Sequence, residues 1–414
     1  IFIEKRPENI ISASDKGHKM VLKKYDMGLI SVTAMGIGSV VGAGIFALLG
    51  EVILQAGNLS YYSFIIAGIA AMFSGYSYAK LSGKYPDSGG LTDYFKIAFK
   101  SRAVSGTFTL IYYITSFVSI SMLAKSFGIY ACKFLHDAAM EPVCVNYFAS
   151  GIIIALAILN MMGADKVGNA ETLMVAFKFF VLLSLIAGAF IELDVRSDKV
   201  DFMPTPTAFL GSIGITFFAY AGYGIITNAA ADVKNPKFTI AAAIYLTIII
   251  VALLYTSLAY IILKYIPEAD LTANADTAIT IAAEKLFGKW GYGIMFAAAI
   301  IAFISGISAT YFSVFRISYA LAEQKIMPKI YHKRFWEHGT YGNALSVAVL
   351  TLATIYFDFN SIVNLASGAY LVSYLAVFAA SWVLRRETGA SPVLILLGSA
   401  LMVFILVMFL ANIY

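Results

Sequence analysis

The sequence predicts an all-α polytopic membrane protein, on the strength of three observations. Of its 414 residues, 60% are hydrophobic and only 13% are charged, whereas soluble domains carry about 25% charged residues. The mean hydropathy is +0.81. The apolar runs are unbroken, which is typical of membrane helices and not of the alternating strands of a membrane barrel. This composition excludes a soluble enzyme, a nucleic-acid-binding protein and a disordered chain.

About eleven segments approach the 20 or so apolar residues that a membrane-spanning helix needs. In chain order they are residues 27–50, 61–81, 103–131, 145–162, 173–191, 208–231, 240–263, 292–322, 344–357, 362–384 and 393–413. The ninth segment is the shortest. No low-complexity linker divides the chain, so we predict a single transmembrane transporter domain over residues 27–414. A polar N-terminal segment, residues 1–26, precedes it.

The distribution of basic residues predicts the orientation of these spans. With the N-terminus placed in the cytoplasm, 20 Lys and Arg residues fall in connections on the inner side and 6 on the outer side. An excess of Lys and Arg in cytoplasmic loops is the usual pattern in membrane proteins. We therefore expect a multi-pass protein of the cell (inner) membrane with a cytoplasmic N-terminus.

Two of the predicted spans contain sequences that weaken a helix. The first has four glycines within residues 36–44, and the sixth reads Phe-Ala-Tyr-Ala-Gly-Tyr-Gly over residues 218–224. Each glycine costs a helix about 1 kcal/mol relative to alanine. Two interruptions five spans apart predict inverted repeats, residues 27–192 and 206–384, with an extra span at 392–414 and a substrate site between the broken helices. Close helix packing through Gly38 and Gly42 is the alternative.

The broken helices predict which solute would bind. Open helix ends offer N–H groups to an anion and carbonyl groups to a cation, so together they suit a zwitterion. Amides near Ala43 and Gly44 would bind a carboxylate, and nearby carbonyls would bind an ammonium group. The predicted substrate-binding residues are Val40, Gly42, Ala43, Gly44, Phe218, Ala221, Gly222 and Tyr223. No acidic residue lies near either break, which favours neutral amino acids, with a broad range possible.

A lysine within the fifth predicted span is the main candidate for ion coupling. Lys178 lies about a third of the way along residues 173–191, where a charge is costly and usually functional. A buried lysine can release its proton near physiological pH, so Lys178 could carry the coupling proton. Snorkelling to the cytoplasmic surface is the alternative. Ser305 and Ser308 of the eighth span could bond beside the ion, although helical hydroxyls often bond their own backbone.

Other kinds of chemistry have no counterpart in the sequence. The four histidines fall in predicted loops, and there is no phosphate-binding loop and no catalytic triad or carboxylate pair at membrane depth. We therefore predict no enzyme activity, no cofactor and no metal site. Cys132 and Cys144 flank one outer connection and could pair in an oxidising compartment. The expected partners are an amino acid, protons and the lipid bilayer, with no nucleic acid.

The chain resembles the amino acid–polyamine–organocation superfamily of transporters, and among them its proton-coupled amino acid permeases. The matches extend from about residue 25 to residue 330. They comprise Gly-Ala-Gly-Ile-Phe at 42–46, Gly-Asn-Ala-Glu at 168–171 before Lys178, Gly-Tyr-Gly-Ile-Ile-Thr-Asn-Ala at 222–229, Asn-Pro-Lys at 235–237 and Tyr-Ala-Leu-Ala at 319–322 with Pro328. Two departures are Ala231, where an acidic residue is common, and Phe238, where a Pro-Arg pair usually follows.

That resemblance implies the leucine-transporter fold, in which spans one to five and six to ten form inverted repeats, and transport by alternating access. It also implies that Lys178 replaces sodium, with its amine near the Gly42 carbonyl and hydroxyls such as those of Ser305 or Ser308. The expected activity is proton-coupled amino acid symport. The alternatives are an exchanger or facilitator in which Lys178 stays charged, an ion-uptake protein on the same scaffold, and a receptor or assembly subunit.

Overall fold

The computed structural model describes residues 27–41, 44–86, 90–135, 142–162, 167–191, 202–336 and 339–413. The predicted N-terminal segment, residues 1–26, lies outside the described residues. The regular structure of the described part is helical, apart from one isolated antiparallel bridge between Arg334 and Thr340. The prediction of an all-α protein is confirmed.

The helices follow the chain as α helices joined by short 3₁₀ helices, which are written η. They are α1 (Leu29–Val40), α2 (Gly44–Ala56), η1 (Gly57–Leu59), α3 (Ser60–Lys84), α4 (Leu91–Phe99), α5 (Arg102–Leu135), α6 (Pro142–Met161), α7 (Val167–Ile191), α8 (Pro206–Ala219), η2 (Tyr223–Asp232), α9 (Pro236–Tyr265), α10 (Glu268–Ala273), η3 (Ala275–Thr277), α11 (Ala278–Glu323), η4 (Lys329–Tyr331), α12 (Tyr341–Tyr356), α13 (Phe359–Val383), α14 (Arg385–Thr388) and α15 (Pro392–Ile413).

Each predicted span has a helical counterpart. In the described part of the chain, nine segments are long and apolar enough to cross a membrane, and α1 and α12 are shorter apolar helices. One of the nine joins α2 to α3 across a turn at Gly57, where φ is +49°. The first and sixth spans each correspond to two elements, α1 with α2 and α8 with η2. The division into two repeats stays a prediction.

The start of the eighth span differs most from the expectation. Helical structure begins at Ala278, within the predicted outer connection, and not near residue 292. Gly288 interrupts it with φ +62° and ψ −156°, so α11 consists of two helical pieces that meet at this glycine. Only glycine adopts such a conformation without strain. This connection therefore contains its own helical turns, α10, η3 and the first piece of α11.

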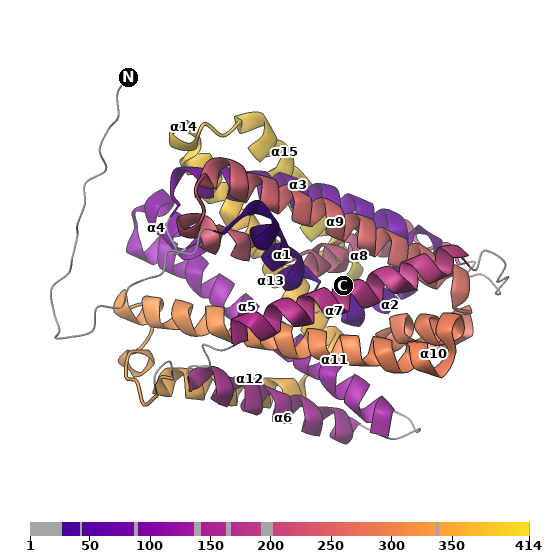
Figure 1. Ribbon diagram of the computed structural model, residues 1–414. Helices are drawn as coiled ribbons and strands as arrows, with labels where there is room; N and C mark the ends of the chain where they lie inside the picture. Colours follow the sequence, from indigo (N-terminus) through magenta and orange to yellow (C-terminus); the bar gives the residue numbers. More distant parts are fainter. Residues whose placement is uncertain are drawn as a thin grey trace.

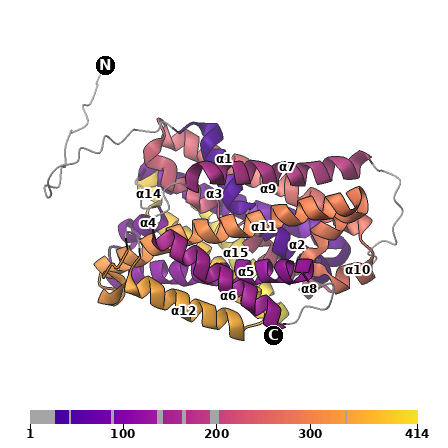
Figure 2. The same ribbon diagram turned by 60° about the horizontal axis from the view of Figure 1, so that its bottom comes forward.

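The long helices enclose the short, broken ones. Figure 1 shows α3 beside α9 along one edge and α6 beside α12 along the opposite edge, with α5 and α11 between them. The view in Figure 2 keeps α6 and α12 side by side. Helix α2 contacts α8, α8 contacts α3, and α1 contacts α9. The ends of α1 and α8 are buried at Val40 and Ala219, which are 2% and 1% exposed. The interruptions therefore lie inside the bundle.

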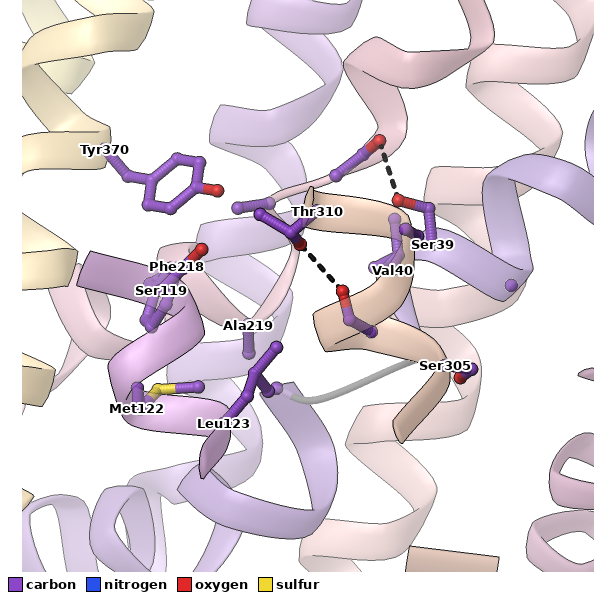
Figure 3. Close-up of a pocket in the computed structure, with 16 residues that line it drawn as sticks. Ser39, Val40, Ser119, Met122, Leu123, Phe218, Ala219, Ser305, Thr310 and Tyr370 are labelled. Atoms are coloured by element: carbon purple, nitrogen blue, oxygen red, sulfur yellow. Dashed lines mark hydrogen bonds between the residues drawn. The ribbon is translucent and has the colours of Figure 1, made fainter. Parts of the chain in front are cut away.

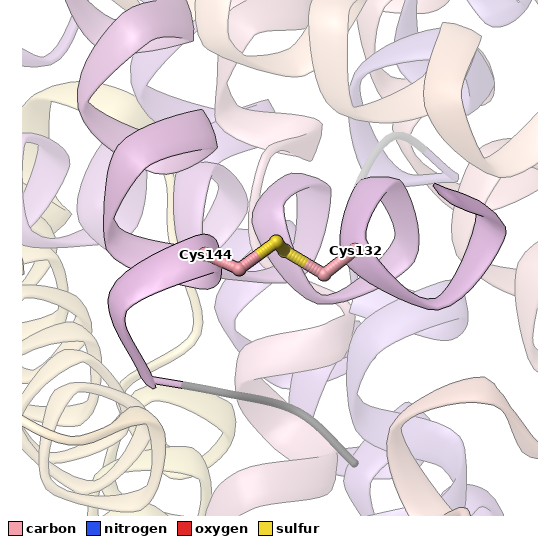
Figure 4. The surroundings of a disulfide bond; sticks show 2 residues. All are labelled: Cys132 and Cys144. Carbon is pink, nitrogen blue, oxygen red and sulfur yellow. A yellow bond between two sulfur atoms is a disulfide. The ribbon is translucent and has the colours of Figure 1, made fainter. Parts of the chain in front are cut away.

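Helices α5 and α6 are held together near the ends that face the connection between them. Cys132 and Cys144 form a disulfide with a Cα–Cα distance of 6.1 Å (Figure 4). One turn before Cys132, a Cβ added to Gly128 would lie 2.4 Å from the carbonyl oxygen of Val145, so glycine is required for the contact. The structure thus forms the bond whose presence the sequence left open.

Candidate functional site

The helix of the first span is interrupted at the predicted place. Helix α1 ends at Val40, and the N–H of the next residue, Val41, donates to the Ile37 carbonyl over 2.8 Å. Helix α2 begins at Gly44. Gly42 and Ala43, two of the predicted substrate-binding residues, lie outside the described residues.

The sixth span is interrupted at residues 220–222. Helix α8 ends at Ala219, and the Ala221 N–H donates to the Phe218 carbonyl over 2.9 Å. Gly222 then adopts φ +121°, a conformation that side-chain-bearing residues rarely adopt. After it the chain continues as the 3₁₀ helix η2. The sequence located this break correctly.

The two interruptions contact each other. The Ser39 hydroxyl donates to the Gly222 carbonyl over 3.2 Å. A Cβ added to Gly44 would lie 2.7 Å from the Cα of Ala219 and 2.8 Å from its carbonyl oxygen. Only a glycine therefore allows the start of α2 to approach the end of α8 this closely. Two segments 180 or so residues apart in the chain thus meet backbone to backbone.

A tyrosine from α9 binds at both breaks. The Tyr255 hydroxyl lies 3.0 Å from the Val40 carbonyl oxygen and 3.4 Å from that of Ala219. Tyr255 is completely buried. Its single hydroxyl proton can serve either carbonyl, which are the last acceptors of α1 and α8. Tyr255 therefore satisfies part of the hydrogen-bonding capacity that the broken helices leave open.

A cavity of about 80 Å³ lies at this junction, room for several water-sized spheres and so for a small solute. Figure 3 shows its walls, which come from α1, α2, α5, α8, α11 and α13 and from the break after α8. The lining residues are Gly38, Ser39, Val40, Gly44, Ser119, Met122, Leu123, Phe218, Ala219, Ala221, Gly222, Ser305, Gly306, Ala309, Thr310 and Tyr370. None of them is charged. Backbone groups and hydroxyls form the polar part of the wall.

The cavity includes most of the described residues that the sequence predicted for substrate binding. Val40, Gly44, Phe218, Ala221 and Gly222 all line it. Tyr223 is not among the lining residues.

The Tyr223 side chain, which follows the break in the sixth span, is completely buried. Its hydroxyl bonds to Ser74, and its ring contacts those of Tyr78 and Tyr374 at centroid distances of 5.9 and 5.5 Å. The structure thus gives the Tyr223 side chain a packing role.

The structure adds lining residues that sequence reasoning did not select. Four of them come from two helices outside the predicted site: Ser119, Met122 and Leu123 from α5, and Tyr370 from α13. The others belong to helices that the prediction already included, namely Gly38, Ser39, Ala219, Gly306, Ala309 and Thr310. The Tyr370 ring packs on Phe218 at a centroid distance of 5.0 Å. The closely spaced hydroxyl residues of α5 were a weak signal for a polar wall, whereas nothing near Tyr370 in the sequence marks it.

Lys178 is completely buried and bonded to the wall of the cavity. Its Nζ donates to the Gly38 carbonyl over 2.9 Å and to the Ser305 hydroxyl over 3.4 Å. Both partners line the cavity. An amine bonded to α1 and α11 inside the bundle does not snorkel to a membrane surface.

The other expected partners of Lys178 are placed differently. The Ser308 hydroxyl accepts a hydrogen bond from the Asn160 side chain over 3.1 Å, so it contacts α6. Gly42, whose carbonyl the resemblance places near the amine, lies outside the described residues. Ser305 is therefore the predicted hydroxyl that the structure brings to Lys178.

The whole described domain is similar to known transporters. The pattern that defines the family described as "Amino acid permease" matches residues 27–414. The chain is 37% identical over 388 residues to the inner membrane transport protein YbaT of Escherichia coli (strain K12), covering 94% of this chain and 90% of that protein. It is 24% identical over 358 residues to the branched-chain amino acid permease BcaP of Bacillus subtilis (strain 168), covering 82% and 75%. It is also 24% identical over 404 residues to the methylthioribose transporter of the same bacterium, covering 92% and 85%.

Proposed function

Because the chain belongs to the amino acid permease family, we propose that it carries neutral amino acids across the cell membrane by alternating access, in symport with protons. Membership of this family makes it a multi-pass membrane transporter and not an enzyme. The observation that carries the proposal is the uncharged cavity between two broken helices, with the buried Lys178 bonded to its wall.

The walls of the cavity support an amino acid as the substrate. The C-terminal ends of α1 and α8 place carbonyl oxygens beside it, and the N-terminus of α2 lies on the same cavity at Gly44. An ammonium group suits the former and a carboxylate the latter. A substrate with a charged side chain would need a countercharge, and no lining residue carries one. Neutral amino acids therefore fit best.

The contacts of Lys178 support proton coupling. When protonated, its ammonium group makes a charge-assisted hydrogen bond to the Gly38 carbonyl, and such bonds are roughly twice as strong as neutral ones. Loss of the proton weakens this bond and loosens α1 next to Ser39, which bonds to the second break. Proton release would thus alter the geometry of the substrate site itself.

The disulfide supports the proposed orientation of the chain in the membrane. Disulfides persist in oxidising compartments, and the Cys132–Cys144 bond lies on the connection that the charge distribution assigns to the outside. We therefore place the N-terminus in the cytoplasm. The two interruptions five spans apart support the assignment of the helices to two inverted repeats of five spans.

The test is uptake of labelled alanine, serine and leucine into liposomes that contain the purified protein, with and without an inward proton gradient. Wild-type uptake should rise several-fold with the gradient. Lys178→Ala and Lys178→Met should lose the response, because neither can carry the proton, and Lys178→Arg should lose it because arginine stays charged. Thermal unfolding of each variant controls for folding.

Each alternative function gives a different outcome in the same assay. Gradient-independent uptake by the wild type, stimulated by amino acid inside the liposomes, would show an exchanger and contradict proton symport. A steady ion current without any amino acid would show an ion-uptake protein. If an amino acid bound to the protein but no amino acid crossed the membrane, the protein would be a receptor, and the proposed transport would be contradicted.

A further inference from the structure

A lysine that takes no part in the substrate site joins α5 to the connection between α9 and α11. The Lys133 Nζ, in the last turn of α5, donates to the Asn274 side-chain oxygen over 3.1 Å and to the Thr277 hydroxyl over 2.8 Å. Asp276 lies between these two partners in the chain, and its carboxylate attracts the same amine. These three residues belong to η3 or directly precede it. The ammonium group of Lys133 therefore holds one short segment of the connection through several atoms.

The same segment packs directly on α2. A Cβ added to Gly50 would overlap the Ala275 carbonyl oxygen, so α2 and η3 meet backbone to backbone at this point. One turn further along the connection, the Thr280 hydroxyl donates to the Tyr130 hydroxyl over 3.4 Å. The Tyr130 hydroxyl donates in turn to the Phe46 carbonyl over 3.2 Å. The connection is therefore held between α2 and α5.

Three buried aromatic rings lie between this segment and the substrate cavity. The Tyr130 ring contacts the Phe303 ring at a centroid distance of 5.3 Å, and the Phe303 ring contacts that of Phe46 at 6.4 Å. Phe46 closely follows Gly44 of the cavity wall on α2, and Phe303 closely precedes Ser305 of the wall on α11. The rings therefore cover the cavity on the side of the connection, and the contacts of the lysine lie beyond them.

We propose that Lys133 is the positioning residue that keeps the connection closed over the cavity, and that its bonds to η3 break when a solute enters from outside. The inference rests on the proposed function, which makes the cavity the substrate site and assigns this connection to the outer side. Hydrogen bonds from an ammonium group are stronger than those between neutral groups. Water replaces the partners of Lys133 in the open arrangement, so the net stabilisation of closure is small enough to be reversible.

The two sides of this contact differ in how firmly they are attached to the bundle. The residue before Lys133 is Cys132, whose disulfide with Cys144 fixes this turn of α5 against α6. On the other side, Gly288 separates the first piece of α11 from the piece that lines the cavity. Lys133 therefore links an anchored helix end to a segment that is not continuous with the cavity wall, as a reversible closure requires.

The test measures how fast a cysteine in the cavity wall reacts with sulfonatoethyl methanethiosulfonate, an anionic reagent that does not cross membranes. Ser119→Cys provides the thiol, because Ser119 lines the cavity and the two native cysteines are bonded to each other. Intact cells expose the outer side, and inside-out vesicles expose the inner side. Lys133→Met removes the ammonium group and should raise the labelling rate in intact cells about tenfold, with no rise in the vesicles. Loss of a positive charge alone would slow an anionic reagent, so faster labelling reports opening.

Lys285→Met is the matched control. The Lys285 ammonium group pairs with the Asp270 carboxylate over 2.7 Å, which joins the first piece of α11 to α10 within the connection, so its loss should leave labelling unchanged. Lys133→Arg retains the positive charge and should label slowly.

Three outcomes for Lys133→Met would overturn the proposal: unchanged labelling in intact cells, an equal rise in Lys285→Met, and faster labelling from both sides, which would show a general loosening of the fold. A rise confined to the vesicles would support the closure and contradict the orientation proposed above. Labelling requires no transport, so a failure of the proposed symport would not be mistaken for a failure of this closure.

Discussion

The Ser39 hydroxyl donates a hydrogen bond to the Gly222 carbonyl over 3.2 Å and so links the break in the first span to the break in the sixth. Both residues line the cavity, and both lie at the end of a helical element. A solute in this cavity therefore contacts two segments that already constrain each other. Any motion of α1 relative to α8 must change this bond.

Gly222→Ala should impair both stability and uptake. The added methyl group would lie 2.9 Å from the Ser39 hydroxyl, and alanine does not adopt φ +121° readily. Such strain costs about 1–3 kcal/mol. Thermal unfolding and liposome uptake measure the two effects. Gly28→Ala is the control, because its Cβ meets nothing within 4 Å and its φ is −87°. Wild-type behaviour of Gly222→Ala would contradict the conformation described here.

Tyr255→Phe should weaken substrate affinity more than it weakens the fold. The substitution removes the hydroxyl that reaches the Val40 and Ala219 carbonyls, at a cost to stability of about 1 kcal/mol. Tyr265→Phe, on the same helix, removes a 2.7 Å bond to Ala189 and is the matched control. Both variants should unfold at similarly lowered temperatures, but only Tyr255→Phe should raise KM for uptake. An equal KM in the two variants would show that the Tyr255 hydroxyl does not contribute to substrate binding.

Ser119→Val should narrow the range of substrates. Ser119 lines a cavity of only about 80 Å³, so added methyl groups exclude large amino acids first. Differences of one methylene in a pocket are worth about tenfold or more in selectivity. Inhibition of labelled alanine uptake by glycine, valine and leucine measures this. The Ser119 hydroxyl donates to the Ser116 carbonyl over 2.7 Å, and the Ser184 hydroxyl of α7 makes a similar bond to the Phe180 carbonyl over 2.9 Å. Ser184→Val is therefore the control and should leave the order of substrate preference unchanged. If inhibition by glycine, valine and leucine fell by the same factor, Ser119 would have no steric role in selectivity.

Asp358 should contribute stability that depends on pH. Its carboxylate accepts from the side chain and the N–H of Ser361 at the start of α13, and these bonds hold its pKa below the ordinary value. Because the folded-state pKa is lowered, the stabilisation is present above the unfolded pKa, near 3.9, and is lost as pH falls through the folded pKa. Asp358→Ala should cost about 1 kcal/mol at neutral pH.

The measurement is the unfolding temperature of both proteins between pH 7 and pH 3. The difference between wild type and Asp358→Ala should be constant down to about pH 5 and then shrink. Asp358→Asn retains a capping side chain without the titrating group, so its difference from Asp358→Ala should not vary with pH. A difference that grows on acidification would contradict the sign of the pKa change.

Removal of the disulfide should lower stability without abolishing the fold. Cys132 and Cys144 are separated by 12 positions in the chain, and closing a loop of this size stabilises a protein by about 2–3 kcal/mol in the chain-entropy view. The double variant Cys132→Ser/Cys144→Ser should unfold earlier, and a reducing agent should have no further effect on it. Equal unfolding of the wild type with and without reductant would show that the bond adds nothing.

The sequence was most informative where chemistry is local. Glycines at 42–44 and 222–224 marked the breaks because an opened helix depends on the residues at that point. Lys178 stood out because a charge within an apolar run has few explanations. The same local signals gave the helix positions closely, except at Gly288, where a glycine joins two helical pieces that the hydropathy pattern did not separate.

Residues that act through tertiary contact were not predictable in this way. Tyr255 and Tyr370 lie in apolar helices among other aromatic residues, and only packing brings them to Val40 and Phe218. Ser305 and Ser308 are equivalent in the sequence, yet one faces Lys178 and the other faces Asn160. Tyr223 is the converse case, since its position beside the break suggested contact with the substrate, and its side chain packs away with Tyr78 and Tyr374.

The close approach of Gly44 to Ala219 makes the two walls of the cavity differ in how strongly they depend on side chains. The closest contacts in this part of the cavity involve main chain, and they require glycine at positions 44 and 222. The opposite wall consists of side chains from α5 and α13, including Ser119 and Tyr370. Substitutions in α5 and α13 can therefore change the shape of the side-chain wall and leave the main-chain wall as it is. If the cavity binds amino acids as proposed, substitutions in the side-chain wall change which amino acids bind, and the main-chain wall keeps its contacts with the backbone atoms that all of them share.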